Sequence, residues 1–182
     1  MLRNPSPVDN FRGPDSCGRR TAPPYFLRTI LLVPILAGLS GVLLHARWVE
    51  DQTGRRVDIP EHPQRLISLA PSITETLFAL GLGESVVGNT DYCEYPPEAK
   101  LKPHVGPILN PNLERIVALK PDLVLGSPEA NRRETADRLA KLGIPLYGGT
   151  AHSVDDMLRS IDDLGRVLGR EAASKKLAAS LR

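Results

Sequence analysis

The side chains that most often do chemistry in proteins are scattered through this sequence. The four histidines lie far apart along the chain: His45, His62, His104 and His152. None of them has the spacing of metal ligands. His104, in a long loop, could contribute a metal ligand, but a solvated loop histidine is the simpler interpretation. The acid pairs 155–156 and 162–163 are explained by the solvated face of a helix. The sequence therefore predicts no catalytic constellation, no metal site and no resident cofactor.

The cysteines and the glycine-rich segments indicate no reactive site either. Cys93 has no nearby histidine or cysteine partner, so we expect a small, half-buried side chain. The stretch "GLGESVVG" at 81–88 follows a predicted helix and lacks the G-x-G-x-x-G spacing, which disfavours dinucleotide binding. There is no Walker loop and no G-x-S-x-G motif. An α/β enzyme is thus supported by its fold class alone, which says little about function.

Four loops carry side chains that are suited to binding a ligand. They follow the predicted strands and carry apolar surface, prolines, tyrosines and hydroxyl groups: 70–72, 89–110, 126–131 and 148–152. In a parallel sheet these loops meet at the carboxyl ends of the strands, where ligands bind. Such an inventory is typical of a binding surface.

A strand and a helix joined by a very short turn position the first of these loops. Residues 66–70 form an apolar run of strand length that ends at Pro71. Ser72 and Glu75 have the spacing of a capping box, and the apolar residues that follow at helical spacing reach Gly81. We therefore expect one βα unit, with the capping box at the start of its helix.

The same alternation continues along the chain. Further strands are predicted at 85–89, 122–126 and 144–149, and helices at 112–120, opened by Asn110 and Pro111, and at 131–143. A hairpin is predicted over 48–60, around Thr53 and Gly54. The fold class is therefore α/β, with a doubly wound parallel sheet of about four strands.

After the fourth strand the pattern changes to helix alone. Ser153 and Asp156 predict a cap for a helix with one apolar face through Leu168, Gly169 interrupts it, and helix continues to residue 182. No fifth strand follows. We expect 47–152 to be one α/β lobe and 153–182 to be a long connecting helix whose second lobe is missing from this sequence.

The first 46 residues read as an export segment. Residues 1–28 are rich in arginine and proline, and 29–44 are free of charge. Cleavage after Ala46 gives a signal peptide, although Leu44 fits the small-residue rule poorly. The alternatives are an uncleaved inner-membrane anchor formed by 29–44, or a start codon chosen too far upstream. Export places the protein in the periplasm.

The net charge excludes a nucleic-acid partner once this segment is set aside. Without residues 1–46, 18 of the 23 basic residues and 19 of the 21 acidic residues remain, a net charge of −1. The basic pI therefore belongs to the leader, and no basic patch is left to bind nucleic acid.

Several motifs, in this order, resemble a known family: "RLISLAPSITETLFALGLG", "YCEYPPEAK", "VGPILNPNLERIVALKPDLVLG" and "LAKLGIPLY". They are similar to the amino-terminal lobe of the periplasmic receptors of vitamin B12, haem and iron-siderophore ABC importers, nearest to the cobalamin-binding branch. The resemblance covers residues 48–182. It implies two α/β lobes joined by a long helix, with a small-molecule ligand between the lobes and an inner-membrane ABC permease as partner.

The resemblance also implies roles for single residues. Pro71 and Ser72 would lie at the floor of the cleft, and Tyr92 matches a tyrosine that packs on cobalamin. Ile108 and Ser127 fall where those receptors tend to carry tryptophans, a departure that bears on corrinoid specificity. Glu114 matches a glutamate that docks on the permease; the alternative is an ordinary acid in the first turn of a helix.

The expected function is therefore a non-catalytic solute receptor that captures cobalamin, a related corrinoid or an iron chelate and delivers it to the permease. Because family members continue into a second lobe, the chain is expected to be a fragment, the product of a truncated gene, or half of a cleft completed by another chain. The alternative functions are a truncated lobe that no longer binds ligand and a signal-anchored interaction protein. In the latter, the apolar face of helix 153–168 would seek a partner chain.

Overall fold

The computed structural model describes residues 46–127, 131, 133–150 and 152–182. All of these belong to one unit of the chain, Val42–Arg182. The described strands are β1 (Ala46–Glu50), β2 (Arg56–Pro60), β3 (Leu66–Ser68), β4 (Val86–Gly88), β5 (Leu123–Gly126) and β6 (Leu146–Gly148). The described α-helices are α1 (Pro71–Ala79), α2 (Leu113–Ala118), α3 (Arg133–Lys141), α4 (Val154–Val167) and α5 (Glu171–Ser180). Residues 1–45 of the predicted signal or anchor segment lie outside the described residues.

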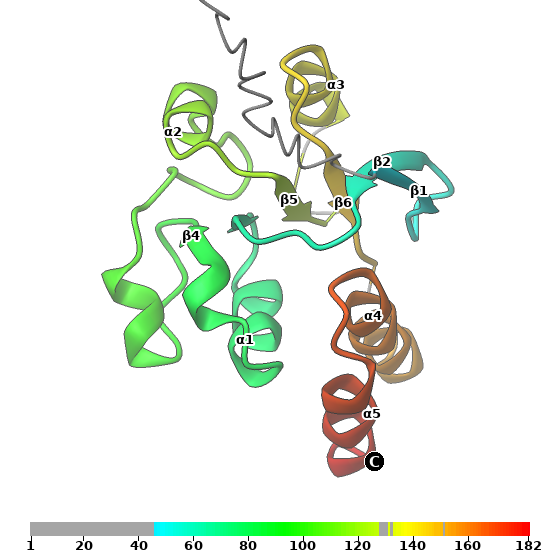
Figure 1. Ribbon diagram of the computed structural model, residues 1–182. Helices are drawn as coiled ribbons and strands as arrows, with labels where there is room; N and C mark the ends of the chain where they lie inside the picture. The colour runs from blue at the N-terminus through cyan, green and yellow to red at the C-terminus, as the bar shows by residue number, and fades with distance from the viewer. Residues whose placement is uncertain (1–45, 128–130, 132, 151) are drawn as a thin grey trace, which may run out of the picture. The chain divides into compact units, whose positions relative to one another are not determined.

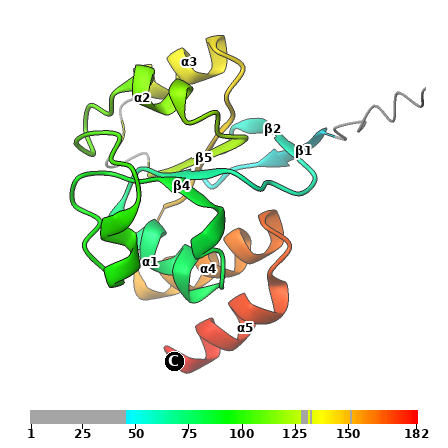
Figure 2. The same ribbon diagram turned by 60° about the vertical axis from the view of Figure 1, so that its left-hand side comes forward.

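The predicted parallel sheet is confirmed. β4, β3, β5 and β6 pair in that order, and every pairing is parallel, while β1 and β2 form the predicted antiparallel hairpin. Figures 1 and 2 show α2 and α3 over one face of the sheet and α1, α4 and α5 over the other. The sheet is therefore doubly wound, with its strands covered on both faces.

Successive residues of the strands point to opposite faces of the sheet and pack into two separate hydrophobic cores. Leu66 and Leu125 pack with α1 and α4, whereas Ile67 and Val124 pack with α2 and α3. All four side chains are fully buried. This explains why the strands are mostly apolar without alternation, since a strand buried on both faces has no polar side.

Helix α1 starts differently from the sequence-based expectation. The predicted capping box is wrong: Ala70 is the N-cap residue, Pro71 is the first helical residue, and no side chain caps the helix. Ser72 and Glu75 are both exposed. Because proline has no N–H to leave unpaired and its φ is already helical, Pro71 itself starts the helix. The Thr74 N–H then donates to the Ala70 carbonyl at 3.0 Å.

The predicted interruption at Gly169 is confirmed, and it divides the segment 153–182 into the two helices α4 and α5. The segment is broken at Leu168–Arg170, where Gly169 has φ of +65°, a left-handed conformation that ends α4. α5 then packs back on α4, and the contact is so close that a Cβ at Gly165 would collide with the side chain of Ser174. The role of this segment as a link to a second lobe stays a prediction.

Most of the apolar face of α4 is covered, although Val154 and Met157 near its start are exposed. Its inward residues are all buried against the core of the sheet: Leu158, Ile161, Leu164 and Val167. The Ser153 cap is confirmed, since its Oγ accepts a hydrogen bond from the Asp156 N–H at 3.1 Å. The expectation of an open apolar face is therefore wrong for the greater part of this helix, because that part packs against the core of its own lobe.

Two smaller expectations have clear outcomes. Cys93 is fully buried rather than half-buried, and its Sγ lies 3.1 Å from the Thr74 hydroxyl and 3.2 Å from the Thr90 hydroxyl. Within the described part of the chain, no helix is both long enough and apolar enough to cross a bilayer.

Candidate ligand-binding site

A pocket of about 220 Å³ opens where three of the predicted loops meet. It lies at the carboxyl ends of β5 and β6 and beside the first turn of α1. The structure thus brings together Ser72 and Ser127, two of the predicted site residues, which are 55 positions apart in the sequence. The remaining lining residues are apolar, small or hydroxyl-bearing: Ile73, Leu125, Gly126, Tyr147, Gly149, Thr150, Ser160 and Leu164.

Tyr147 is one of the apolar residues that line the pocket. Its side chain is buried, and burial, together with the carboxylates of Asp163 and Asp51, raises the pKa of its phenol to about 12. The ring is therefore neutral throughout the physiological pH range. Among the described residues, no group of three or more His, Cys, Asp or Glu side chains could hold a metal ion. An apolar floor with hydroxyl groups at its rim is suited to binding an organic ligand.

The amide of Asn131 connects two of the loops. Asn131 is buried; its Oδ1 accepts from the Ser127 N–H at 2.9 Å, and its Nδ2 donates to the Ile108 carbonyl at 2.7 Å. The amide also packs over Gly126, where an added Cβ would lie 2.7 Å from Oδ1. One side chain thus fixes the spacing of the predicted site residues Ile108 and Ser127.

The turn of the hairpin is also part of this edge of the sheet. Asp51 accepts a hydrogen bond from the Gly148 N–H at 3.2 Å, and Gln52 donates its N–H to the Gly148 carbonyl at 3.1 Å. The Gln52 side chain accepts from the Thr150 N–H at 2.6 Å and donates to Asp163 at 2.7 Å. The turn is therefore bound to the end of β6 and to α4.

Asp51 keeps its charge although it is buried. Burial would raise the pKa of its carboxyl, but hydrogen bonds from Thr53 and Arg55 and the positive charge of Arg55 outweigh that effect and hold it below the usual value of 3.8. The Arg55 guanidinium donates to Asp51 Oδ2 through Nε at 3.1 Å and Nη2 at 2.8 Å. This pair stiffens the turn where it meets β6.

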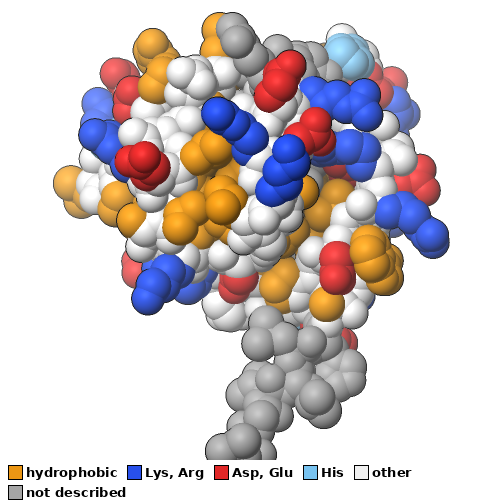
Figure 3. Space-filling model, turned by 90° about the horizontal axis from the view of Figure 1, so that it is seen from above, with side chains coloured by type: hydrophobic (Ala, Val, Ile, Leu, Met, Phe, Trp, Pro, Cys, Tyr) orange, Lys and Arg blue, Asp and Glu red, His pale blue; other side chains and the backbone are white. Residues whose placement is uncertain are grey.

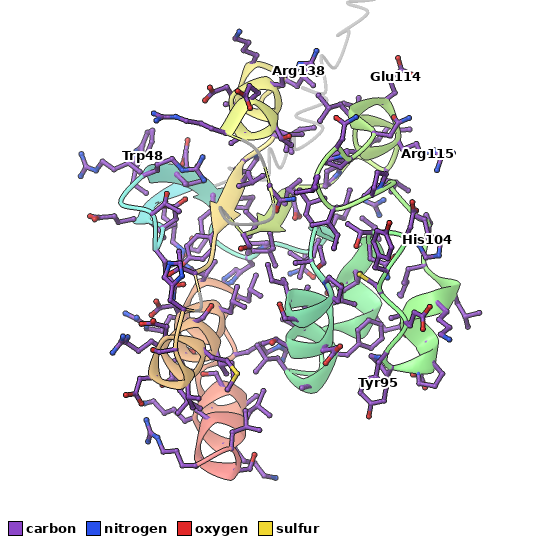
Figure 4. The ribbon with its side chains drawn as sticks, turned by 180° about the vertical axis from the view of Figure 1, so that it is seen from behind. Trp48, Tyr95, His104, Glu114, Arg115 and Arg138 are labelled. Carbon is purple, nitrogen blue, oxygen red and sulfur yellow. The ribbon has the colours of Figure 1, made fainter. Side chains whose placement is uncertain are left out.

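The other predicted residues are less closely joined. Pro71 is half-buried and precedes Ser72, but it does not line the pocket. Tyr92 is 60% exposed in the loop after β4, where its ring is accessible to a ligand. Glu114 is exposed in the first turn of α2 and points away from the body of the sheet (Figure 4). His104 is half-buried, and its Nδ1 lies 3.1 Å from the Thr90 carbonyl.

Comparison with known proteins identifies the family. Residues 66–182 match the family described as Periplasmic binding protein. The chain belongs to this family. Membership agrees with the α/β lobe and with a binding site at the carboxyl ends of the strands.

Relatives within and around this family bind several kinds of ligand. The Vitamin B12-binding protein of Pectobacterium carotovorum subsp. carotovorum (strain PC1) is 43% identical over 102 residues, which cover 56% of this chain and 37% of that protein. The periplasmic vitamin B12 binding protein BtuF of Vibrio cholerae is 32% identical with a TM-score of 0.60, over 65% of this chain and 46% of that one. A periplasmic heme binding protein from Pseudomonas aeruginosa is 26% identical with a TM-score of 0.63, over 66% of this chain and 43% of that one.

The matched region spans less than half the length of each of these relatives. The resemblance to vitamin B12 and haem receptors is thus confirmed for one lobe of a periplasmic binding protein. None of these comparisons supports a second lobe supplied by another chain.

Proposed function

We propose that this chain forms a ligand-binding lobe of a solute receptor for an ABC importer, with no catalytic activity of its own. Its solute would be a cobalamin, a related corrinoid, or an iron chelate such as haem or a ferric siderophore. The observation that carries the proposal is the pocket at the carboxyl ends of β5 and β6, in a chain of the periplasmic binding protein family. The pocket of 220 Å³ is too small for a whole macrocycle, so it would take one edge of such a ligand.

Tyr92 would pack on the flat face of the ligand. Its ring is largely exposed, and covering such a ring with a macrocycle buries apolar area at little cost in side-chain entropy. Removing the ring should cost about 1.4–2 kcal/mol of binding free energy, or roughly ten- to thirty-fold in Kd. Tyr95 offers a matched control, since it lies in the same loop and is 67% exposed.

The experiment is a calorimetric titration of the whole chain with cobalamin, cobinamide, haem and a ferric siderophore. We expect one of them to bind with micromolar or tighter affinity, Tyr92→Ala to weaken that binding by the factor above, and Tyr95→Ala to leave it unchanged within about twofold. If the folded protein binds none of the four, the proposed capture function is refuted, and a lobe that no longer binds ligand becomes the better description.

We further propose that Glu114 docks on the permease after export of the chain to the periplasm through residues 1–46. The carboxylate of Glu114 is exposed at the start of α2. Glu134 provides the control, because it is an exposed acid in the first turn of the neighbouring helix α3. In a reconstituted importer, Glu114→Ala should reduce receptor-stimulated ATP hydrolysis, whereas Glu134→Ala should not; equal effects of both would contradict a specific docking role.

A further inference from the structure

A second pocket lies next to the first and has a different chemistry. Its volume is about 250 Å³, and it lies between the turn of the hairpin, the end of β6 and the start of α3. Ser127 lines both pockets, so the second one adjoins the proposed ligand site. Figure 3 looks onto the side of the molecule that carries α2 and α3, where Lys and Arg side chains lie beside an exposed apolar patch.

Both of the described charged residues that line the second pocket are arginines. Arg55 comes from the hairpin turn and Arg133 is the first residue of α3, and no acid is among the described residues that line the pocket. The polar side chains of Thr53 and Asn131 complete its wall. Because α3 begins here, its helix dipole also favours negative charge at this end.

Arg55 is held in place without losing its capacity to bind an anion. Two of its nitrogens, Nε and Nη2, donate to Asp51, and they use only part of the five N–H groups that a guanidinium carries. The Asp51 carboxylate in turn accepts from the Thr53 N–H at 2.9 Å and the Gly148 N–H at 3.2 Å. Since these backbone donors share the negative charge of Asp51, the outer side of the Arg55 fork remains a preorganised donor.

Arg133 is the less constrained of the two arginines as far as the described residues go. Its side chain is exposed, and it makes no ion pair with any residue that the structure describes. Two guanidinium groups that face one small pocket from opposite elements suit an oxyanion, because each fork can donate two parallel hydrogen bonds to carboxylate or phosphate oxygens.

We propose that the Arg55–Arg133 pocket binds a carboxylate or phosphate group carried by the ligand. This inference rests on the proposed function, because it assigns a subsite beside the pocket that takes one edge of the ligand. A volume of 250 Å³ admits a charged side group but not a whole macrocycle. The lobe would therefore prefer ligands with a peripheral oxyanion over the same ligands with that group esterified.

The first test uses the anions alone on the whole chain. Sodium citrate and inorganic phosphate are titrated separately at constant ionic strength into protein labelled with nitrogen-15, and the arginine Nε–H signals are followed by NMR. We expect saturable shifts of the Arg55 and Arg133 signals for at least one anion, with the two titrations distinguishing a carboxylate site from a phosphate site.

Two matched variants decide whether the binding is local. Arg133→Gln removes the less constrained cation, and Arg138→Gln makes the same change further along α3, at the exposed position labelled in Figure 4. Arg133→Gln should weaken the anion at least tenfold, and Arg138→Gln should leave its affinity unchanged. Absence of saturable shifts, or equal effects of the two variants, would overturn the proposal.

The second test separates this proposal from the proposed function. Haem and its dimethyl ester are titrated into the wild-type chain and into Arg133→Gln. If haem binds, esterification should weaken it in the wild type and have little effect in the variant; equal loss in both would overturn the subsite. If no macrocycle binds but citrate or phosphate still binds through Arg133, the capture function fails while the anion pocket stands.

Discussion

Replacing Asn131 with alanine should loosen the binding edge of the lobe without disturbing the sheet. The change removes the acceptor of the Ser127 N–H and the donor to the Ile108 carbonyl. Leaving a buried donor or acceptor without a hydrogen bond lowers the free energy of unfolding by about 1–3 kcal/mol. Because Ser127 and Ile108 are half-buried, water can hydrogen-bond to the freed groups and offset part of that loss. We therefore expect a loss of about 2 kcal/mol in the free energy of unfolding, or a fall in Tm of about 6–10 °C for a domain of this size.

The assay combines urea unfolding with amide hydrogen exchange. Asn131→Ala should lower the unfolding midpoint and speed exchange at the Ser127 N–H. Asn131→Asp keeps an acceptor for that N–H but turns a carboxylate oxygen toward the Ile108 carbonyl. It should therefore keep Ser127 protected while it still destabilises the loop that carries Ile108.

Asn110→Ala is the matched control, because Asn110 is an exposed amide in the same loop as Ile108. It should change the free energy of unfolding by less than about 0.5 kcal/mol. The reasoning is refuted if Asn131→Ala is as mild as this control, or if the Ser127 N–H exchanges equally fast in the wild type and in Asn131→Ala.

Three further substitutions test other parts of the lobe. The depressed pKa of Asp51 means that its contribution to stability is full above about pH 5 and is lost as the pH falls through a value below 3.8. Asp51→Asn should therefore cost about 2–3 kcal/mol at pH 7 in urea unfolding and much less at pH 3; a loss that does not change with pH would contradict this. Gly165→Ala should cost about 1–3 kcal/mol by forcing α4 and α5 apart, and Ser174→Gly in the same chain should restore most of it; without such rescue the close contact is not the cause. Asn112→Ala removes the side-chain acceptor of the Arg115 N–H at the start of α2, and should cost about 0.5–2 kcal/mol in thermal unfolding; a neutral effect would mean that this cap is dispensable.

Much of the fold follows from local sequence patterns. The runs 66–70 and 122–126 are mostly apolar, with Ser68 and Asp122 as their polar residues, and each is bounded by proline or glycine; the structure has a buried strand within each of them. The start of α1 was mispredicted because Ser72 and Glu75 have the spacing of a capping box, whereas Pro71 already provides a helical start. The capping-box pattern and the proline start predict different first residues for the helix, and the helix begins at the proline because its φ is already helical.

The candidate site could be predicted only in part. Ser72 and Ser127 were found because each follows a strand of the parallel sheet, and topology alone brings such loops together. Asn131 and Asp51 were missed, since their partners are decided by packing between distant segments; 97 positions separate Asp51 from Gly148. The one local signal was "DQTGR" at 51–55, in which an aspartate begins a turn and its carboxylate accepts from the Thr53 N–H.

The hairpin turn has two roles, one in covering an edge of the sheet and one in the proposed anion binding. β6 is an edge strand of the parallel sheet, and an unpaired edge invites association with other chains. Gln52 and Asp51 cover the carboxyl end of that edge through the backbone of Gly148, and the same Asp51 orients Arg55 beside the ligand pocket. Loss of Asp51 should therefore weaken citrate or phosphate binding even at temperatures where the lobe is still folded. By contrast, the loosened α4–α5 contact of Gly165→Ala should lower stability alone, because Gly165 does not line either pocket.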